Sequence, residues 1–284
     1  MRKNKQLLII AVTAIGLGLT AALTAVAVVY SGAYDISATR QHWQATHSLL
    51  EIAMRQSVRQ QAASIEEPAL TDPQMALRGA ASFHDKCVQC HGAPGVAQSA
   101  IGLSMQPLPG PLVDAKRHWR PRELYWVVRH GIKMTGMPAW QYRLADAEIW
   151  DLVAFMQQLP QLDAMQYAQW TRPGLATPAR ESHAPASAAT FTPDVERGRQ
   201  ALHQYACSAC HTIPGVTGSR VHVGPPLKGM GTRTLIAGTL ANSPANLALW
   251  LTATQQVKPG TAMPQLGVSS RDAQDIAAYL STLR

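Results

Sequence analysis

The sequence predicts an all-α chain in which one N-terminal transmembrane helix precedes two tandem domains of the same plan. Three observations lead to this prediction. Residues 7–30 form an apolar run without a charge. A C-x-x-C-H pentapeptide occurs twice, at residues 87–91 and 207–211, so the two copies begin 120 positions apart. Each copy is followed by a Met-Pro pair at a similar distance, with Met137 46 residues after the first motif histidine and Met263 52 residues after the second. Similar loops after the same motif favour one fold used twice.

The apolar run is long enough to cross a membrane. As a helix its 24 residues would span roughly 36 Å, against a hydrocarbon core of about 30 Å. The alternative is a cleaved signal peptide, whose apolar region usually covers only about 7 to 15 residues, and no convincing A-x-A site follows. Because Arg2, Lys3 and Lys5 make residues 1–6 a basic end that stays in the cytoplasm, we expect a bacterial inner-membrane anchor at 7–30 with both motifs in the periplasm.

The remaining chain divides at changes in composition and periodicity. Trp43, Leu50, Met54 and Val58 recur at helical spacing and predict a membrane-proximal helix that rests on the membrane surface or on a partner subunit. Amphipathic helices are expected to open and close each domain, and a stretch rich in Ala, Pro, Ser and Thr separates the domains. The predicted segments are 31–72 for the helix and a linker, 73–162 for the first domain, 163–192 for the interdomain linker and 193–284 for the second domain.

The pentapeptides predict covalently bound haem. Two thiols three positions apart can bond to the two vinyl groups of one haem, while the next residue offers an imidazole to the iron. The two motifs use all four cysteines of the chain, so no thiol is left for another role. The predicted attachment residues are Cys87, Cys90, Cys207 and Cys210, and the predicted iron ligands from the motifs are His91 and His211.

Other uses of a C-x-x-C pair fit the sequence less well. A zinc ribbon needs two such pairs held roughly 15 to 20 residues apart, which the separation of 120 positions exceeds. A thioredoxin-like dithiol or a disulfide does not require histidine directly after the second cysteine, which here occurs twice. Two haems are therefore the expected cofactors.

A low-spin haem that only carries electrons requires a second strong axial ligand, and a thioether raises the reduction potential. Met137 and Met263, each followed by proline, are the expected ligands. Met134 and Met105 are rivals of Met137, since any methionine can also serve as core filling. Bis-histidine ligation, through a histidine outside the motifs, is a further alternative.

The charge balance favours protein partners. The formal net charge is +8, with +3 in residues 73–162 and +4 in residues 193–284 before any haem propionate is counted. The sequence contains no Lys/Arg cluster or motif typical of nucleic-acid binding. The basic balance therefore predicts steering toward acidic protein surfaces rather than toward nucleic acid.

Beyond these inferences, residues 73–162 and 193–284 resemble class I cytochrome c domains. The resemblance implies a small all-α fold whose first and last helices cross near the haem, with His and Met ligands on opposite faces. In the family's G-P-x-L motif a proline carbonyl orients the histidine. Residues 224–227 match this motif, so Pro225 would serve His211. Residues 110–112 match it more loosely and would assign the same role to Pro111.

The second domain is similar to the cytochrome c domain fused to subunit II of some bacterial haem-copper oxidases, through the run RTLIAGTLANSPANLALWLTATQQVKPGTAMP. That resemblance implies that Arg233 and Trp250 contact haem propionates, with core packing as the less favoured alternative for Trp250. The chain differs in having one transmembrane segment and no copper-binding cluster outside the motifs. The run ELYWVVRHGIKMTGMPAW in the first domain resembles a group of bacterial respiratory cytochromes.

Together these features predict a periplasmic, membrane-anchored dihaem electron carrier rather than an enzyme. It would deliver electrons to a terminal haem-copper oxidase, as a subunit or as a tethered donor, and receive them from a quinol-oxidising complex or a soluble cytochrome. The alternative is the electron-accepting subunit of a periplasmic dehydrogenase. A dihaem peroxidase is less favoured, because it needs an open iron site and the two Met-Pro loops argue against one.

Overall fold

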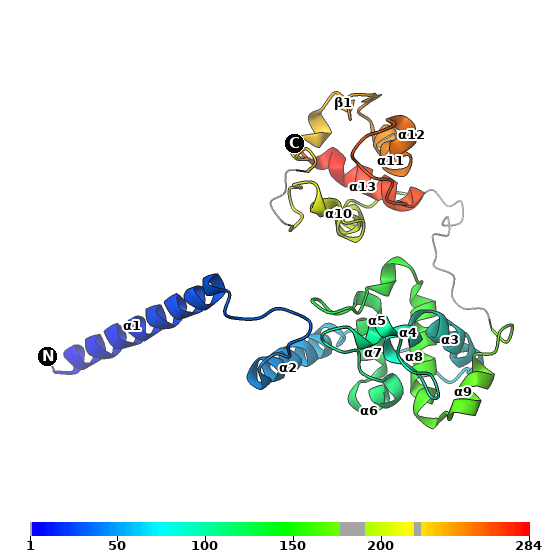
Figure 1. The fold of residues 1–284 in the computed structure, drawn as a ribbon, viewed down its shortest axis with the longest axis horizontal. Coiled ribbons are helices and arrows are strands. Elements are labelled where there is room, and N and C mark those ends of the chain that lie inside the picture. Colours follow the sequence, from blue (N-terminus) through cyan, green and yellow to red (C-terminus); the bar gives the residue numbers. More distant parts are fainter. Residues whose placement is uncertain (1, 177–190, 219–222) are drawn as a thin grey trace. The chain divides into compact units, whose positions relative to one another are not determined.

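The computed structural model describes residues 2–176, 191–218 and 223–284 (Figure 1). The chain divides into two compact units, Met1–Arg180 and Glu181–Arg284. Helices make up nearly all the regular structure of the described residues, with one two-stranded hairpin in the second unit. The predicted all-α class is confirmed, apart from that hairpin.

The first helix, α1 (Arg2–Ser31), is the candidate membrane segment. Its stretch Lys3–Ser31 has a mean hydropathy of 2.3, and none of its most apolar part is buried against the rest of the protein. The hydroxyls of Thr20 and Thr24 donate to backbone carbonyls one turn earlier, each at 2.9 Å, so these polar groups are satisfied within the helix. Length and composition alone allow either an anchor or a signal sequence.

The second helix, α2 (Gln44–Gln61), packs against the rest of the first unit through its C-terminal half. Val58 is only 1% exposed. The Arg55 guanidinium lies 5.2 Å from the centre of the Trp119 ring, and Arg122 Nη1 donates to Ala63 O at 3.4 Å just beyond the helix. A helix is therefore present where the sequence predicts one, and it belongs in part to the first domain, while its position near the membrane stays a prediction.

The first unit is built on two longer helices, α3 (Pro73–Lys86) and α8 (Asp146–Gln158), whose buried faces form the core with α7 (Pro121–His130). The shorter helices and helical turns of the unit are α4 (Val88–His91), α5 (Ala100–Leu103), η1 (Leu112–Asp114), α6 (Ala115–His118), η2 (Trp140–Tyr142), η3 (Leu159–Gln161) and α9 (Ala164–Trp170).

The second unit repeats this plan with α10 (Val195–Gln204) and α13 (Ser270–Thr282) as its paired helices. Its other elements are η4 (Cys207–Ala209), η5 (Met230–Thr232), β1 (Leu235–Ile236), β2 (Leu240–Ala241), α11 (Pro244–Thr252) and α12 (Thr254–Val257). The strands are antiparallel and joined by a tight turn in which Ala237 and Gly238 have φ of 50° and 75°. Two successive positive φ values are typical of a type I′ hairpin turn.

A glycine lets the paired helices touch in each unit. A Cβ at Gly79 of α3 would lie 1.9 Å from the backbone oxygen of Asp151 in α8. A Cβ at Gly198 of α10 would lie 2.0 Å from the backbone oxygen of Asp275 in α13. Any side chain at these positions would force the helices apart, so the same contact defines both units.

An arginine next to each glycine ties the same helix pair together. Arg78 binds the Asp151 carboxylate through two hydrogen bonds, of 2.7 and 2.9 Å. In the second unit, Arg197 pairs with the fully buried carboxylate of Asp275. Each ion pair lies beside the close helix contact, so the two units share an ion pair between the paired helices as well as the glycine contact.

The expected interdomain linker, 163–192, begins instead with a helix of the first unit. Asp163 caps α9 by accepting a 2.7 Å hydrogen bond from the Gln166 amide. Tyr167 of α9 is 1% exposed and lies in the first core. The prediction was wrong for this part, because a single buried tyrosine gives no clear periodicity. Residues 177–190 of the expected linker lie outside the described residues.

Candidate haem-binding sites

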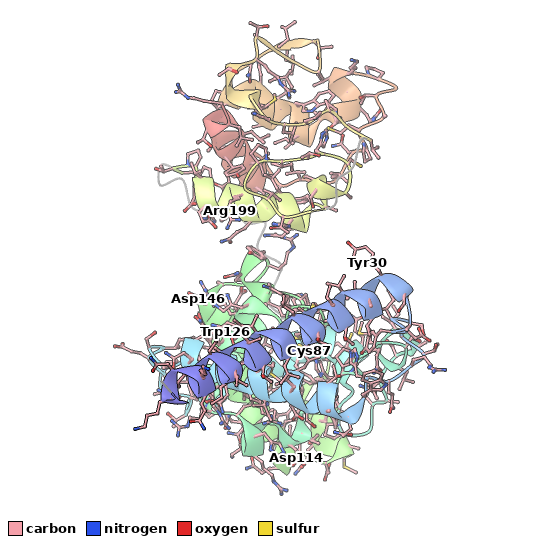
Figure 2. All side chains as sticks on the ribbon, turned by 90° about the vertical axis from the view of Figure 1, so that its left-hand side faces the viewer. Tyr30, Cys87, Asp114, Trp126, Asp146 and Arg199 are labelled. Carbon is pink, nitrogen blue, oxygen red and sulfur yellow. The ribbon has the colours of Figure 1, made fainter. Side chains whose placement is uncertain are left out.

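The first thiol pair lies where α3 meets α4. Figure 2 labels Cys87, the first residue of this pair. The Cys87 amide donates to Phe83 O at 2.9 Å, which ends α3. The amides of Cys90 and His91 both donate to Cys87 O, at 3.1 and 3.0 Å. One helical turn therefore presents two free, half-buried thiols together with an imidazole.

The second motif has the same local geometry in η4. The amides of Cys210 and His211 donate to Cys207 O at 3.2 and 3.0 Å. The Cys207 thiol is buried, and the Cys210 thiol is half-buried. In both units, two thiols and an imidazole projecting from one turn are the donor set that a haem c requires, so the residues present fit that group.

Burial raises the pKa of the first thiol of each motif. It raises the pKa of the Cys87 thiol to about 12 and that of the Cys207 thiol to about 11. A dithiol that works by thiol exchange needs a thiolate near neutral pH, and its pKa is therefore usually lowered. The environment of the two cysteines suits a fixed attachment better than thiol redox chemistry.

A backbone carbonyl orients each motif histidine. His91 Nδ1 lies 2.8 Å from Gly110 O. Because a carbonyl can only accept, the ring proton sits on Nδ1, and Nε2 keeps its lone pair for a metal. Burial lowers the pKa of His91, against the opposing effect of the Gly110 hydrogen bond. The ring is therefore held neutral, as an iron ligand must be.

The second unit shows the expected form of this contact. His211 Nδ1 lies 2.8 Å from Pro225 O. A Cβ at Gly224 would lie 2.4 Å from His211 Cε1, so only glycine allows the loop to approach the ring this closely. The proline carbonyl that the sequence assigned to His211 makes the contact.

In the first unit the corresponding carbonyl is not that of Pro111, and this expectation is corrected. The acceptor is Gly110 O, one residue earlier. The loop 109–112, Pro-Gly-Pro-Leu, takes the place of 224–227, Gly-Pro-Pro-Leu, so glycine and proline are exchanged at its first two positions. The sequence match had been placed one residue too late.

Met137 lies in a loop that hydrogen bonds hold at both ends. Its amide donates to Thr135 Oγ1 at 3.1 Å, and its carbonyl accepts from the Ile132 amide at 3.3 Å. Gly131, with φ of 66°, lies so close that a Cβ there would be 2.6 Å from Met137 O. The Met137 side chain is half-buried against the first core.

The two rival methionines are placed differently. Met134 is 93% exposed and has φ of 62°, so its side chain points to solvent. Met105 is half-buried, and its sulfur would lie 2.6 Å from a Cβ at Gly136. Met105 therefore packs against the methionine loop, while Met137 remains the proposed ligand.

The Met263 loop is braced by a side chain. Gln255 of α12 donates from Nε2 to Thr261 O at 2.9 Å and to Met263 O at 2.7 Å. The Met263 side chain is half-buried against the second core. Lys258, which precedes this loop, donates from Nζ to Ala237 O at 2.9 Å and so joins it to the hairpin turn.

Arg233 and Trp250 occupy different environments. Arg233 is half-buried and donates from Nη2 to Pro226 O and, at 3.2 Å, to Lys228 O, which places it on the loop that carries Pro225. Trp250 is 8% exposed and lies in the second core. Arg233 therefore stays a candidate for a propionate contact, and Trp250 has at least a packing role.

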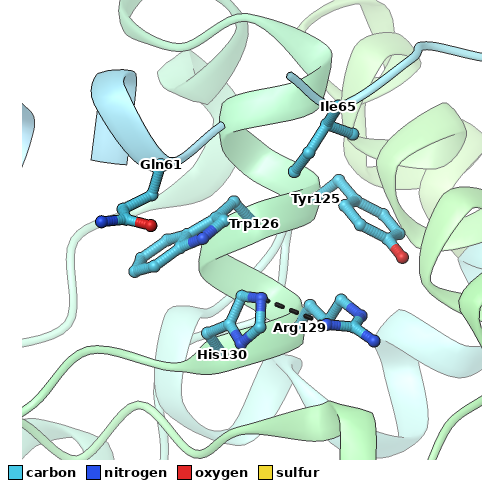
Figure 3. A pocket seen from close by; sticks show the side chains of 6 residues that line it. All are labelled: Gln61, Ile65, Tyr125, Trp126, Arg129 and His130. Carbon is cyan, nitrogen blue, oxygen red and sulfur yellow. Dashed lines mark hydrogen bonds between the residues drawn. The ribbon is translucent and has the colours of Figure 1, made fainter. Parts of the chain in front are cut away.

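A pocket of about 580 Å³ lies between the end of α2 and α7 (Figure 3). Its lining residues are Gln61, Ile65, Tyr125, Trp126, Arg129 and His130. Arg129 pairs with Asp146 at 3.0 Å and also donates to His130 Nε2 at 3.2 Å. Burial and the Arg129 charge lower the pKa of His130. Because the Arg129 cation is already paired with Asp146, the pocket shows no built site for an anion.

Sequence reasoning missed the glutamines that brace the loops. Gln98 donates from Nε2 to Cys90 O at 2.6 Å and to Pro109 O at 2.7 Å. Gln255 plays a comparable part in the Met263 loop. Neither belongs to a motif, and glutamine in a loop has no periodicity that would single it out.

These sites define the class of the two units, which are cytochrome c-type domains. Residues 74–156 match the family model of cytochrome c oxidase, cbb3-type, subunit III, and residues 195–284 match that of cytochrome c. The chain is also 36% identical over 89 residues to cytochrome c oxidase subunit 2 of Alkalihalophilus pseudofirmus, covering 31% of this chain and 25% of that protein. The chain thus spans about a quarter of the length of this relative.

The two matches cover the two structural units separately and imply that the chain binds haem c. A dihaem cytochrome c fits these matches and the pair of motifs. The chain therefore consists of a candidate N-terminal membrane helix followed by two cytochrome c-type electron-transfer domains.

Proposed function

We propose that the chain is a membrane-anchored electron carrier with two covalently bound haems. Haem c would supply one-electron redox chemistry at its iron. The chain would hold it by the four motif cysteines and orient it through the two imidazoles. The proposed iron ligands are His91 and Met137 in the first unit and His211 and Met263 in the second.

One observation carries this proposal: each unit has the same set of haem-binding groups, arranged around its own pair of packed helices. Each has a thiol pair, a histidine whose Nδ1 is bound to a carbonyl, and a half-buried methionine in a braced loop. A methionine at the sixth position would leave no site for substrate, whereas a peroxidase needs an open one. The proposed function is therefore that of an electron carrier and not that of an enzyme.

The proposed electron acceptor is a terminal haem-copper oxidase, which the chain would serve as a subunit or as a tethered donor. The similarity to an oxidase subunit 2 and the match to an oxidase subunit family support this proposal. The proposed donor is a quinol-oxidising complex or a soluble cytochrome.

The proposed location is the bacterial inner membrane, with α1 as the anchor and both haem domains in the periplasm. The basic residues at the start of α1 support this orientation. Membranes washed with alkaline carbonate should retain the chain. Its release into the wash would identify α1 as a removed signal sequence.

The test is affinity purification of the full chain from membranes in mild detergent, followed by a subunit gel and a reduced-minus-oxidised spectrum. Oxidase-type haem bands, together with ascorbate-driven oxygen uptake, would support the oxidase assignment. A c-type spectrum accompanied by a dehydrogenase subunit would overturn it in favour of the alternative. Peroxide turnover with a high-spin ferric spectrum would contradict the carrier function.

A further inference from the structure

The two units tie their histidine-binding loops to the haem motif in different ways. In the second unit, the Gly224 amide donates to Cys210 O at 2.7 Å, and the Leu227 amide donates to Thr212 O at 2.9 Å. These two backbone hydrogen bonds fix the loop that presents Pro225 O to the imidazole.

The first unit cannot form the first of these bonds. The residue before Gly110, which corresponds to Gly224, is Pro109, and proline has no amide hydrogen. Within residues 90–112, all of which are described, the structure shows no backbone hydrogen bond between the loop 109–112 and the motif. The carbonyl of Cys90 would therefore lose the partner that Cys210 has.

The Gln98 side chain supplies the missing hydrogen bond to Cys90 O. Its two Nε2 hydrogens go to Cys90 O at 2.6 Å and to Pro109 O at 2.7 Å, so one side chain links the motif to the loop. Both partners are carbonyl oxygens, which only accept, and this fixes the orientation of the amide group.

The surrounding backbone holds Gln98 in place. The Ser99 amide donates to Gln89 O at 2.8 Å. Gly92, with φ of 65°, lies against Gln98, since a Cβ there would be 3.5 Å from Gln98 Cγ. The half-buried side chain therefore bridges two segments that are themselves anchored.

The geometry points to Gln98 as a positioning residue for the first haem, replacing the backbone hydrogen bond that Pro109 cannot make. By fixing the loop, it holds Gly110 O against His91 Nδ1. A hydrogen bond accepted from Nδ1–H makes an imidazole a stronger donor to its metal, which stabilises ferric iron. This inference rests on the proposed function in taking residues 87–91 as a haem site.

The test is a spectroelectrochemical titration of the full chain carrying Gln98→Leu. The potential of the first haem should rise and that of the second should stay unchanged. The wave altered by Met137→Ala identifies the first haem, and Gln169→Leu, at an exposed position of α9 in the same unit, is the matched control. An unchanged or lowered first potential in Gln98→Leu would overturn the inference.

A second variant tests the replacement itself. Pro109→Ala restores a backbone amide and keeps the Cβ already present at this position. Combined with Gln98→Leu, it should bring the first potential back toward the wild-type value. An equal shift in the single and double variants would show that Gln98 does not stand in for the missing amide. Mass spectrometry separates this failure from that of the proposed function, because a chain without two attached haems contradicts the function instead.

Discussion

The two proposed methionine ligands are held by hydrogen bonds of their loops, which leaves their thioethers free to bind iron. Replacing Met263 by Ala would remove the strong sixth ligand while leaving Gln255 bound to the loop carbonyls. We expect the second haem to become high-spin with a lower potential, and electron delivery to be abolished. Absorption spectra and oxygen uptake of membranes check this. Met134→Ala, at an exposed position, is the control and should change neither.

The Asp146 carboxylate makes the stability of the first unit sensitive to acid. Burial raises the pKa of Asp146, but hydrogen bonds from Arg129 and Tyr125 together hold it below its ordinary value. The charged form therefore stabilises the fold above the unfolded-state pKa, and this contribution is lost as the pH falls through the lower folded-state value.

Below about pH 4, the wild-type protein should thus lose stability more steeply than Asp146→Asn. The difference should stay under about 1 kcal/mol, because the carboxylate is largely solvent-exposed. Urea midpoints of the first unit, measured against pH, decide this. Parallel slopes for the wild type and Asp146→Asn would contradict the assignment.

Among the elements, the crossing of α10 and α13 depends on Gly198. The Cβ of Gly198→Ala would meet the backbone of α13, which cannot rotate away, so the helices must separate. We expect a loss of about 3 kcal/mol in the free energy of unfolding of the second unit. Thermal unfolding followed by circular dichroism measures it. Gln274→Ala, on an exposed position of α13, should be within about 0.5 kcal/mol of wild type.

The ion pair between Arg197 and Asp275, beside this crossing, stabilises the unit by charge rather than by packing. In Arg197→Met the buried carboxylate of Asp275 would keep, among the hydrogen bonds of the described residues, that from the Asp194 amide, which donates to it at 2.7 Å. Removing one partner of a buried pair leaves an uncompensated charge, and we expect a cost of about 3 kcal/mol. Asp275→Asn in the Arg197→Met background should recover part of it. A double variant less stable than the single one would argue against charge as the cause.

The paired helices of each unit could be predicted because hydrophobic spacing is local, whereas the predicted end of the first domain fell before α9, which packs into its core. The haem motifs were found for the same reason, since five adjacent residues carry the chemistry. Contacts between distant segments leave no such pattern. The bond between Gln98 and Pro109 O, the choice of Gly110 rather than Pro111, and the burial of Tyr167 all depend on how the chain folds back on itself.

Over the whole second unit, the acidic side chains of the described residues are confined to two helix starts, where they lie among Arg197, Arg199 and Arg271. The described carboxylates lie at the starts of α10 and α13, namely Asp194, Glu196, Asp272 and Asp275. Lys228, Arg233 and Lys258 lie instead on the loops around Pro225 and Met263. Arg233 and Lys258 donate hydrogen bonds to backbone carbonyls. In the described part of the chain, none of these three cations forms an ion pair. This arrangement leaves a positive surface around the proposed haem site.

A positive surface beside the haem should steer the unit toward an acidic partner. The full chain carrying both Lys228→Gln and Lys258→Gln should therefore deliver electrons to the proposed oxidase more slowly at low ionic strength, by roughly tenfold. Added salt should remove most of the difference, because exposed charges are screened within about 10 Å at 0.1 M salt. Stopped-flow kinetics at several salt concentrations measure both effects. Arg271→Gln, an exposed cation near the acidic helix starts, is the matched control. It removes one charge, so net charge rather than the loop surface would govern the encounter if it slowed transfer as much as either lysine variant does alone.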